Sequence, residues 1–185
     1  MSTTQPADSE TLLADSETLP IAAGVWHVDP AAGRLGFRVR SMWGLVPVSG
    51  QFRSYEGELR IDEAGLATGE LAVAAASLDT KHNKRDEHLR SGDFFNVEEH
   101  PTISFSVAAV TARPGGLTIA GDLHIGSSVV RLQLPVTLTR PGEDRLRVQA
   151  STSVPRETVG LTWNRAGMIR GNALLNVELD LVRVP

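Results

Sequence analysis

The sequence predicts a mainly β fold, one closed antiparallel β-barrel of about eight strands with a single short helix between strands. Two observations predict it. Apolar and polar residues alternate with a period of two through most of the chain after Trp26, which places successive side chains on opposite faces of a strand. Clusters of Gly, Pro, Asp and Ser separate the alternating segments, as hairpin turns require. Closure into a barrel would bury the shared apolar face.

The first alternating segment carries Leu35, Phe37 and Val39 on one face and arginines on the other. Alternation stops over residues 79–92, where helix formers gather, so this segment is the predicted helix, with Asp79 or Thr80 as its N-cap and Gly92 at its end. Further strands are expected around residues 48–55, 58–62, 71–78, 102–107, 117–125, 130–139, 145–149 and 175–181.

Length and composition indicate one domain with a sizeable core. The chain has 185 residues, of which 41% are hydrophobic and 22% charged, as in ordinary globular proteins. A formal charge of -4 argues against nucleic acid as a partner, because phosphate binding needs a concentrated basic surface. The absence of cysteine excludes disulfides and thiolate chemistry.

Residues 1–22 are predicted to be a flexible acidic tail ahead of a barrel domain at residues 23–185. Residues 7–12 (ADSETL) recur as residues 14–19. The heptad spacing would also suit a short helix, but one apolar position per turn buries little surface, so a flexible tail is favoured. Docking of the tail on the barrel is left open.

The start of the chain predicts a cytoplasmic location. A secretory signal needs a basic start before an apolar run, whereas the first Lys or Arg here is Arg34. Every apolar stretch is shorter than the ~18 residues of a membrane helix, so we expect at most peripheral membrane contact.

The inward face of the predicted barrel is almost wholly Leu, Ile, Val and Phe. A barrel of about eight strands is wide enough either to fill with side chains or to hold one small ligand. A ligand in such an interior would be a hydrocarbon, since burial of apolar area contributes roughly 25 cal/mol per Å². The pattern alone leaves the filled core and the ligand cavity equally open.

Four blocks of the sequence resemble the YceI-like proteins, lipocalin-like barrels associated with polyisoprenoids and related lipids. The resemblance runs from about Trp26 to Val184, and its most specific block leads from Ser77-Leu78-Asp79-Thr80 to Phe105. Family members often carry a histidine where this chain has Ser41, and many carry a secretory signal. The blocks read WHVDP with GFRVRSM and VSGQF; SLDT, RDEHL, SGDFF and HPTISF; GDLHI; and VPR with GLTWN.

The resemblance implies that the interior is a channel for a polyisoprenoid, an isoprenoid quinone or a similar acyl lipid. It also suggests a homodimer and places Asp79 and Asp86 at the mouth as polar head-group contacts. Trp43 would equally suit a surface loop. The residues expected to contact the lipid are Leu35, Phe37, Val39, Met42, Trp43, Phe52, Leu78, Phe94, Phe95, Ile103, Phe105, Leu123, Leu132, Leu134 and Trp163.

Catalytic, metal and cofactor functions are not expected. His82 and His88 are six residues apart, so a helix would point them to different sides, whereas paired ligands are three or four apart. A solvated, charged helix over one barrel end is the preferred interpretation. The sequence shows no nucleophile elbow or phosphate-binding glycine loop. The alternative to a lipid carrier or buffer is a non-enzymatic interaction or structural barrel with a filled or empty core.

Overall fold

The computed structural model describes residues 21–185. Within them lie ten strands, one α-helix and four short 3-10 segments, the latter at Met42–Gly44, Ala75–Ser77, Arg156–Val159 and Arg165–Gly167. In chain order the strands and the helix are β1 (Gly24–Ser41), β2 (Val46–Phe52), β3 (Tyr55–Ile61), β4 (Ala67–Ala74), β5 (Leu78–Asp79), α1 (Asn83–Arg90), β6 (Thr102–Arg113), β7 (Gly116–Ile125), β8 (Ser128–Gly142), β9 (Arg145–Val154) and β10 (Arg170–Arg183).

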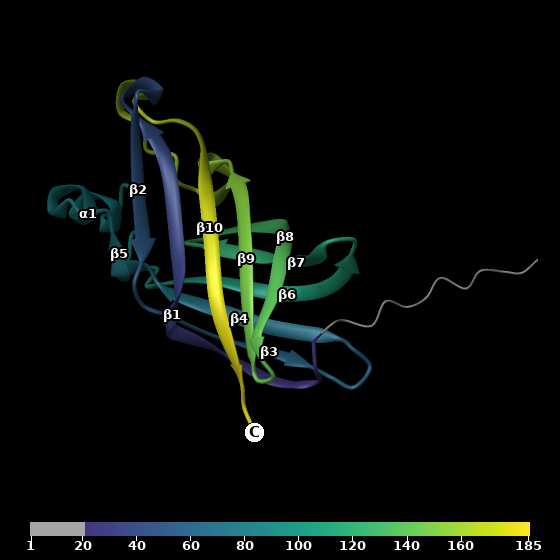
Figure 1. Cartoon of the computed structure of the whole chain (residues 1–185). Helices are drawn as coiled ribbons and strands as arrows, with labels where there is room; N and C mark the ends of the chain where they lie inside the picture. The colour runs from purple at the N-terminus through teal and green to yellow at the C-terminus, as the bar shows by residue number, and fades with distance from the viewer. Residues whose placement is uncertain (1–20) are drawn as a thin grey trace, which may run out of the picture.

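Eight of the strands close into one antiparallel barrel (Figure 1). The ring runs β1-β3-β4-β6-β7-β8-β9-β10, and β10 pairs with β1 to complete it. Hairpin turns join most neighbours, as at Asp62–Gly65, where Gly65 takes a positive φ of 82° and the Asp62 carboxylate accepts the N–H of Leu66. The predicted eight-stranded barrel with one helix is confirmed.

The long strand β1 contacts two partners along one edge. Its first residues pair with β3, and its last part, Leu35–Ser41, pairs with β2. The strand predicted over residues 48–55 is therefore split between β2 and β3. The break falls at Arg53 and Ser54, because Ser77 Oγ accepts both of their backbone N–H groups, at 3.2 and 3.1 Å.

One end of the barrel is tightly packed. Trp26 is only 1% exposed there, and its indole N–H donates to the carbonyl of Ala22 at 3.1 Å. Ile21 is buried in the same core. Ile21 thus packs with the barrel, whereas residues 1–20 of the predicted tail lie outside the described residues, and the boundary between tail and domain stays a prediction.

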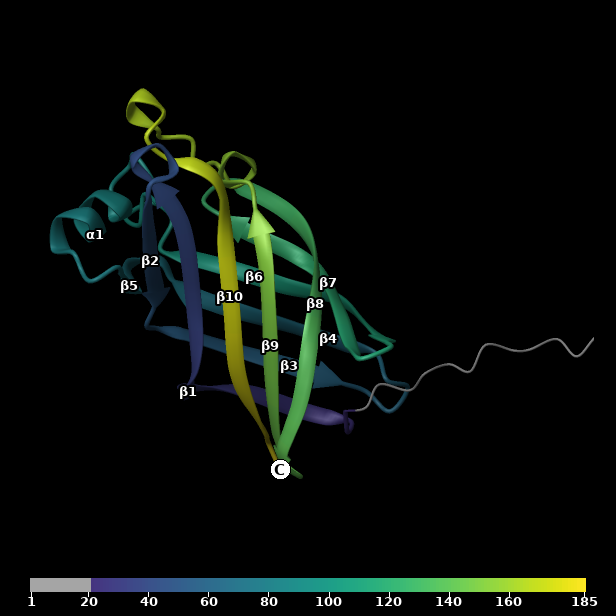
Figure 2. The same ribbon diagram turned by 45° about the horizontal axis from the view of Figure 1, so that its top comes forward.

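The opposite end of the barrel, its mouth, is surrounded by longer connections (Figure 2). They are residues 42–45, residues 75–101 with α1, and residues 155–169, and the short turn after β7 lies at the same end. The helix begins later than predicted. Its N-cap is His82, whose Nδ1 accepts the N–H of Arg85 at 3.3 Å, because Asp79 and Thr80 are occupied in other contacts described below.

Candidate functional site

A cavity of about 430 Å³ lies inside the barrel. This volume falls within the ~300–1,000 Å³ typical of small-molecule sites. Inward-facing aliphatic and aromatic side chains of β1–β4 and β6–β10 form its wall, with Val136 and Leu181 among those deepest in the barrel. Trp26 and Leu146, which pack the closed end, do not border it. The barrel interior is therefore an apolar pocket and not a core filled by side chains.

Most of the residues expected to contact a lipid border this cavity. Those from strands do so because alternate positions of a strand share one face, and the others lie in the connections at the mouth. Their contact with a ligand stays a prediction. They are Leu35, Phe37, Val39, Phe52, Phe94, Phe95, Ile103, Phe105, Leu123, Leu132, Leu134 and Trp163.

Gly50 makes room for an aromatic ring in the cavity wall. It pairs directly with Phe37 across β1 and β2, and a Cβ at Gly50 would lie 2.4 Å from the Phe37 ring. The Phe37 ring lies 5.7 Å from that of Phe52, which meets Phe95 edge-on at 6.0 Å. These centroid distances are typical of favourable aromatic pairs. The glycine therefore allows a continuous aromatic path from the wall to the mouth.

Three of the expected lipid contacts do not border the cavity. Leu78 is completely buried, but the 3-10 segment Ala75–Ser77 interrupts the strand before it, so the alternation of β4 no longer directs Leu78 into the barrel. Met42 and Trp43 follow the end of β1, where the chain leaves the sheet, and Trp43 is 51% exposed. Period-two reasoning does not carry over to either place, because a 3-10 segment breaks the alternation before Leu78 and begins at Met42.

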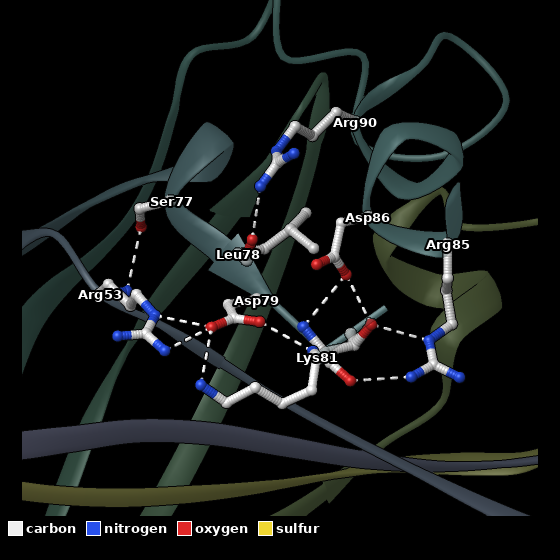
Figure 3. Close-up of polar contacts among 9 residues, drawn as sticks. Arg53, Ser77, Leu78, Asp79, Lys81, Arg85, Asp86 and Arg90 are labelled. Carbon is white, nitrogen blue, oxygen red and sulfur yellow. Dashed lines mark hydrogen bonds and ion pairs between the residues drawn. The ribbon is translucent and has the colours of Figure 1, made fainter. Parts of the chain in front are cut away.

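Asp79 and Asp86 also lie outside the cavity lining, in a polar network that fastens α1 to β5 (Figure 3). Asp86 is buried and accepts hydrogen bonds from the backbone N–H and the hydroxyl of Thr80. Arg90, at the end of the helix, donates to the carbonyls of Ala76 and Leu78 at 2.8 and 2.7 Å. The two carboxylates therefore face the protein backbone and cations instead of the cavity, and they hold the helix in place.

Asp79 is held in its charged form by this network. The backbone N–H of Lys81 donates to Oδ1 at 2.7 Å, and Arg53 donates to Oδ2 through its Nε at 2.7 Å. These contacts, with the backbone donor first in importance, lower the pKa of Asp79 to about 2. The charge of Asp79 is thus satisfied by Arg53, between β2 and β3, and by Lys81, in the segment before α1.

Three aromatic side chains cluster at the mouth. The His88 ring meets Trp163 edge-on with centroids 4.6 Å apart and meets Phe94 at 5.1 Å, while Phe94 and Trp163 are 5.1 Å apart. His88 Nε2 lies 3.1 Å from a carboxylate oxygen of Asp93. All three rings border the cavity. They join α1 to the connection between β9 and β10 across the opening.

Two arginines also line the cavity at the mouth. Arg85 donates through Nε and Nη2 to the hydroxyl and carbonyl oxygens of Thr80. Arg156, with a side chain 8% exposed, donates through Nη1 to the carbonyls of Leu161 and Trp163 and pairs through Nη2 with Glu157 at 2.6 Å. Within residues 21–185, its Nε is the one buried side-chain nitrogen or oxygen without a hydrogen-bond partner.

Sequence reasoning had assigned no role to Gly50, Arg85, His88 or Arg156. Each lies within a block that carries the family resemblance, so the blocks were a usable signal. Arg85, His88 and Arg156 are polar, which argued against placing them beside an apolar cavity. Their positions depend on how the connections at the mouth fold.

Residues 21–185 contain no group of three or more His, Asp or Glu side chains placed to hold a metal ion. Within the same part of the chain, no helix is long and apolar enough to cross a bilayer.

The sequence matches the model of the YceI-like domain over residues 26–181. A UPF0312 protein of Photorhabdus laumondii is 33% identical over 112 residues, which cover 60% of this chain and 58% of the relative. The alignment thus spans less than two thirds of that relative's own length.

Two solved structures share the fold. BcnA of Burkholderia cenocepacia is 19% identical, with a TM-score of 0.73 over 83% of this chain and 98% of that one. A polyisoprenoid binding domain from Saccharophagus degradans, implicated in plant cell wall breakdown, is 17% identical, with a TM-score of 0.67 over 86% of this chain and 98% of that one. At these identities the likeness concerns the fold.

Proposed function

The chain belongs to the YceI-like family, and from that premise we propose that its barrel binds one long apolar lipid, as a carrier or buffer and without catalysing a reaction on it. The observation that carries the proposal is the apolar cavity of about 430 Å³ inside the barrel. Burial of a hydrocarbon chain there is favourable by roughly 25 cal/mol for each Å² removed from water. A polyisoprenoid, an isoprenoid quinone or an acyl chain would each present such a surface.

The lipid would enter at the mouth, with its polar end beside Arg156. The closed end is packed around Trp26, whereas Arg85 and Arg156 border the cavity at the mouth. Glu58 on β3 and Glu70 on β4 border it as well. A buried N–H without a partner destabilises a protein by about 1–3 kcal/mol. An oxygen of the lipid head would satisfy the Nε of Arg156, so the proposal favours a lipid with a carbonyl, hydroxyl, carboxylate or phosphate head over a plain hydrocarbon.

A binding role is favoured over catalysis by the kind of polar groups at the mouth. Nucleophilic catalysis by Ser or Thr needs a base within hydrogen-bond reach of the hydroxyl. Among the hydrogen bonds of residues 21–185, none joins a histidine to a Ser or Thr hydroxyl, and His88 contacts Asp93 instead. The arginines at the mouth are suited to binding an oxygen and not to proton transfer, because a guanidinium keeps its protons.

Extraction of purified protein with organic solvent, followed by mass spectrometry, tests the proposal. We expect a long isoprenoid or acyl lipid in near-stoichiometric amount, and stabilisation of delipidated protein when that lipid is returned. Repeated absence of such a lipid, together with no stabilisation by added polyprenol, quinone or fatty acid, would overturn the proposal. A structural or interaction barrel with an empty interior would then be the better interpretation.

Location and assembly are separate proposals. A cytoplasmic location is one of them, and fractionation of the producing cells would test it. A homodimer is supported only by the family resemblance, and light scattering after size-exclusion chromatography would test it.

A further inference from the structure

An exposed apolar tip projects beside the mouth of the barrel. It comprises the loop between β1 and β2, residues 42–45, and the first residue of β2, Val46. Leu45 is 81% exposed, and Met42, Trp43 and Val46 are also exposed. Large side chains exposed singly are ordinary, but four within five consecutive residues form a patch of the kind that marks an interaction surface.

The tip is held rigidly in this exposed position. The backbone N–H of Trp43 donates to the carbonyl of Met168 at 2.9 Å, and its indole N–H donates to the carbonyl of Ala166 at 3.1 Å. Met42, Trp43 and Ala166 take positive φ values of 50°, 57° and 52°, which residues other than glycine seldom adopt. Such strain persists where surrounding contacts impose it, and it is concentrated at functional sites. Figures 1 and 2 show the loop between β1 and β2 and the loop before β10 together at the mouth end of the barrel.

The segments that form the tip carry positive charge only. Residues 30–55 and 158–177 contain several arginines and no Asp or Glu, although the whole chain has a formal charge of -4. Arg38, Arg40 and Arg170 are exposed, and Arg40 and Arg170 lie opposite each other where β1 pairs with β10. The apolar tip is therefore flanked by cations on an otherwise acidic protein.

We propose that this tip docks on an anionic lipid surface. Tryptophan is enriched at the level of the lipid head groups, where its ring is buried and its N–H is satisfied, and the Trp43 indole N–H is already bonded within the protein. Leu45 would enter the acyl boundary, and the arginines would lie among lipid phosphates. A second copy of the tip is a poorer partner, because two arginine-flanked surfaces would repel each other.

Docking through the tip would place the mouth of the cavity next to the membrane. Met168 and Ile169, in the loop that holds Trp43, border the cavity, as does Ser41 at the base of the tip. A lipid could then pass between bilayer and barrel without crossing water. This consequence rests on the proposed lipid binding, whereas docking itself does not.

Co-sedimentation with vesicles tests the proposal. The full chain is mixed with vesicles of phosphatidylcholine alone or with phosphatidylglycerol added. We expect binding to the anionic vesicles at least about tenfold tighter than to the neutral ones, and a blue shift of tryptophan fluorescence on binding that W43S/L45S lacks. The double variant W43S/L45S should lose the binding, and R38Q/R170Q should reduce the preference for anionic vesicles.

Matched controls make the same changes elsewhere on the surface. Leu66 and Val129 are exposed apolar residues outside the tip, and Arg140 is an exposed arginine near the closed end. L66S/V129S and R140Q should bind vesicles like the original chain. Equal binding by W43S/L45S and the original chain would overturn the proposal, and so would a dimer that becomes monomeric only in the tip variant, since the tip would then be an interface between copies.

The two proposals fail separately. Lipid extracted from W43S/L45S should match that of the original chain, because the tip residues do not border the cavity. A protein that retains its lipid but ignores anionic vesicles would overturn docking alone.

Discussion

His88 on α1 and Trp163 in the connection between β9 and β10 meet edge-on across the mouth of the barrel, with ring centroids 4.6 Å apart and planes at 89°. The pair joins two segments that are distant in sequence. Since both rings also border the cavity, this contact lies between the cavity and solvent. The mouth is therefore narrowed by aromatic contacts that can separate without unfolding the sheet.

Replacement of Trp163 by Ala should speed the release of bound lipid. Aromatic pairs contribute about 0.5–1.5 kcal/mol beyond burial, which corresponds to an increase of roughly twofold to tenfold in the release rate if the contact is broken during exit. Transfer of a fluorescent lipid to acceptor vesicles measures this rate. Leu174→Ala, at an exposed position of β10, is the control and should leave it unchanged. An unaltered rate in Trp163→Ala would mean that lipid leaves by another route.

Ala150→Trp should block the cavity at little cost in stability. Ala150 lines the cavity on β9, so an indole would occupy part of its 430 Å³. In a filled core the same change would destabilise the fold by about 1–3 kcal/mol. We expect the variant to lose lipid binding while its free energy of unfolding, measured in urea, changes by less than about 1 kcal/mol.

Gln149→Trp is the matched control for this experiment. Gln149 is the neighbouring residue on the same strand and is exposed on the outer face. The Gln149→Trp variant should keep both the stability and the lipid binding of the original chain. A large loss of stability in Ala150→Trp with none in Gln149→Trp would show that the interior cannot accommodate added volume.

The wall of the cavity was predictable from the sequence, and the reason is geometric. Phe37, Leu123 and Leu132 lie in regular strands, where alternation dictates the face of each side chain. The same reasoning did not extend to Leu78, which follows the 3-10 segment Ala75–Ser77, or to Trp43, for which the sequence left a surface loop equally open. Alternation carries no information across a break in the strand.

The polar contacts were harder to predict because they depend on how connections fold. Asp79 and Asp86 belong to the most specific sequence block, yet a block does not reveal whether a carboxylate faces a ligand or the backbone of its own chain. Arg156 reaches the mouth only because the chain after it folds back, so that Nη1 meets the carbonyls of Leu161 and Trp163. Such contacts join residues that no periodicity relates.

Asp79 should make the stability of the protein depend on pH in the acid range. Its pKa in the folded protein is about 2, below the ordinary value of 3.8. A carboxyl whose pKa is lowered on folding stabilises the native state above its unfolded pKa, and this contribution disappears as the pH falls through the folded pKa. The stability contributed by Asp79 is therefore present above pH 3.8 and lost as the pH approaches 2.

Urea unfolding of Asp79→Asn between pH 2 and pH 6 measures this contribution. The free energy of unfolding of the variant should be lower than that of the original chain at the higher pH values. The two free energies should become equal as the pH is lowered. Asp144→Asn, in the turn between β8 and β9, makes the same change of charge at the closed end and is the control. A difference in stability that is independent of pH would contradict the role given to the Asp79 charge.

Arg156→Lys should reduce the preference of the cavity for lipids with an oxygen-bearing head. Lysine keeps the charge but has neither the Nε donor nor the planar fork that meets two carbonyls and Glu157. A hydrogen bond to a charged group contributes about 1.5–3 kcal/mol, so the affinity for a long-chain carboxylate should fall at least about tenfold. The affinity for an alkane of equal length should change little. Fluorescent displacement assays with both ligands give the ratio, and Arg131→Lys, at an exposed pair with Asp122, is the control. An equal loss for both ligands would mean that Arg156 only supports the loop, because damage to the loop would weaken the binding of any chain.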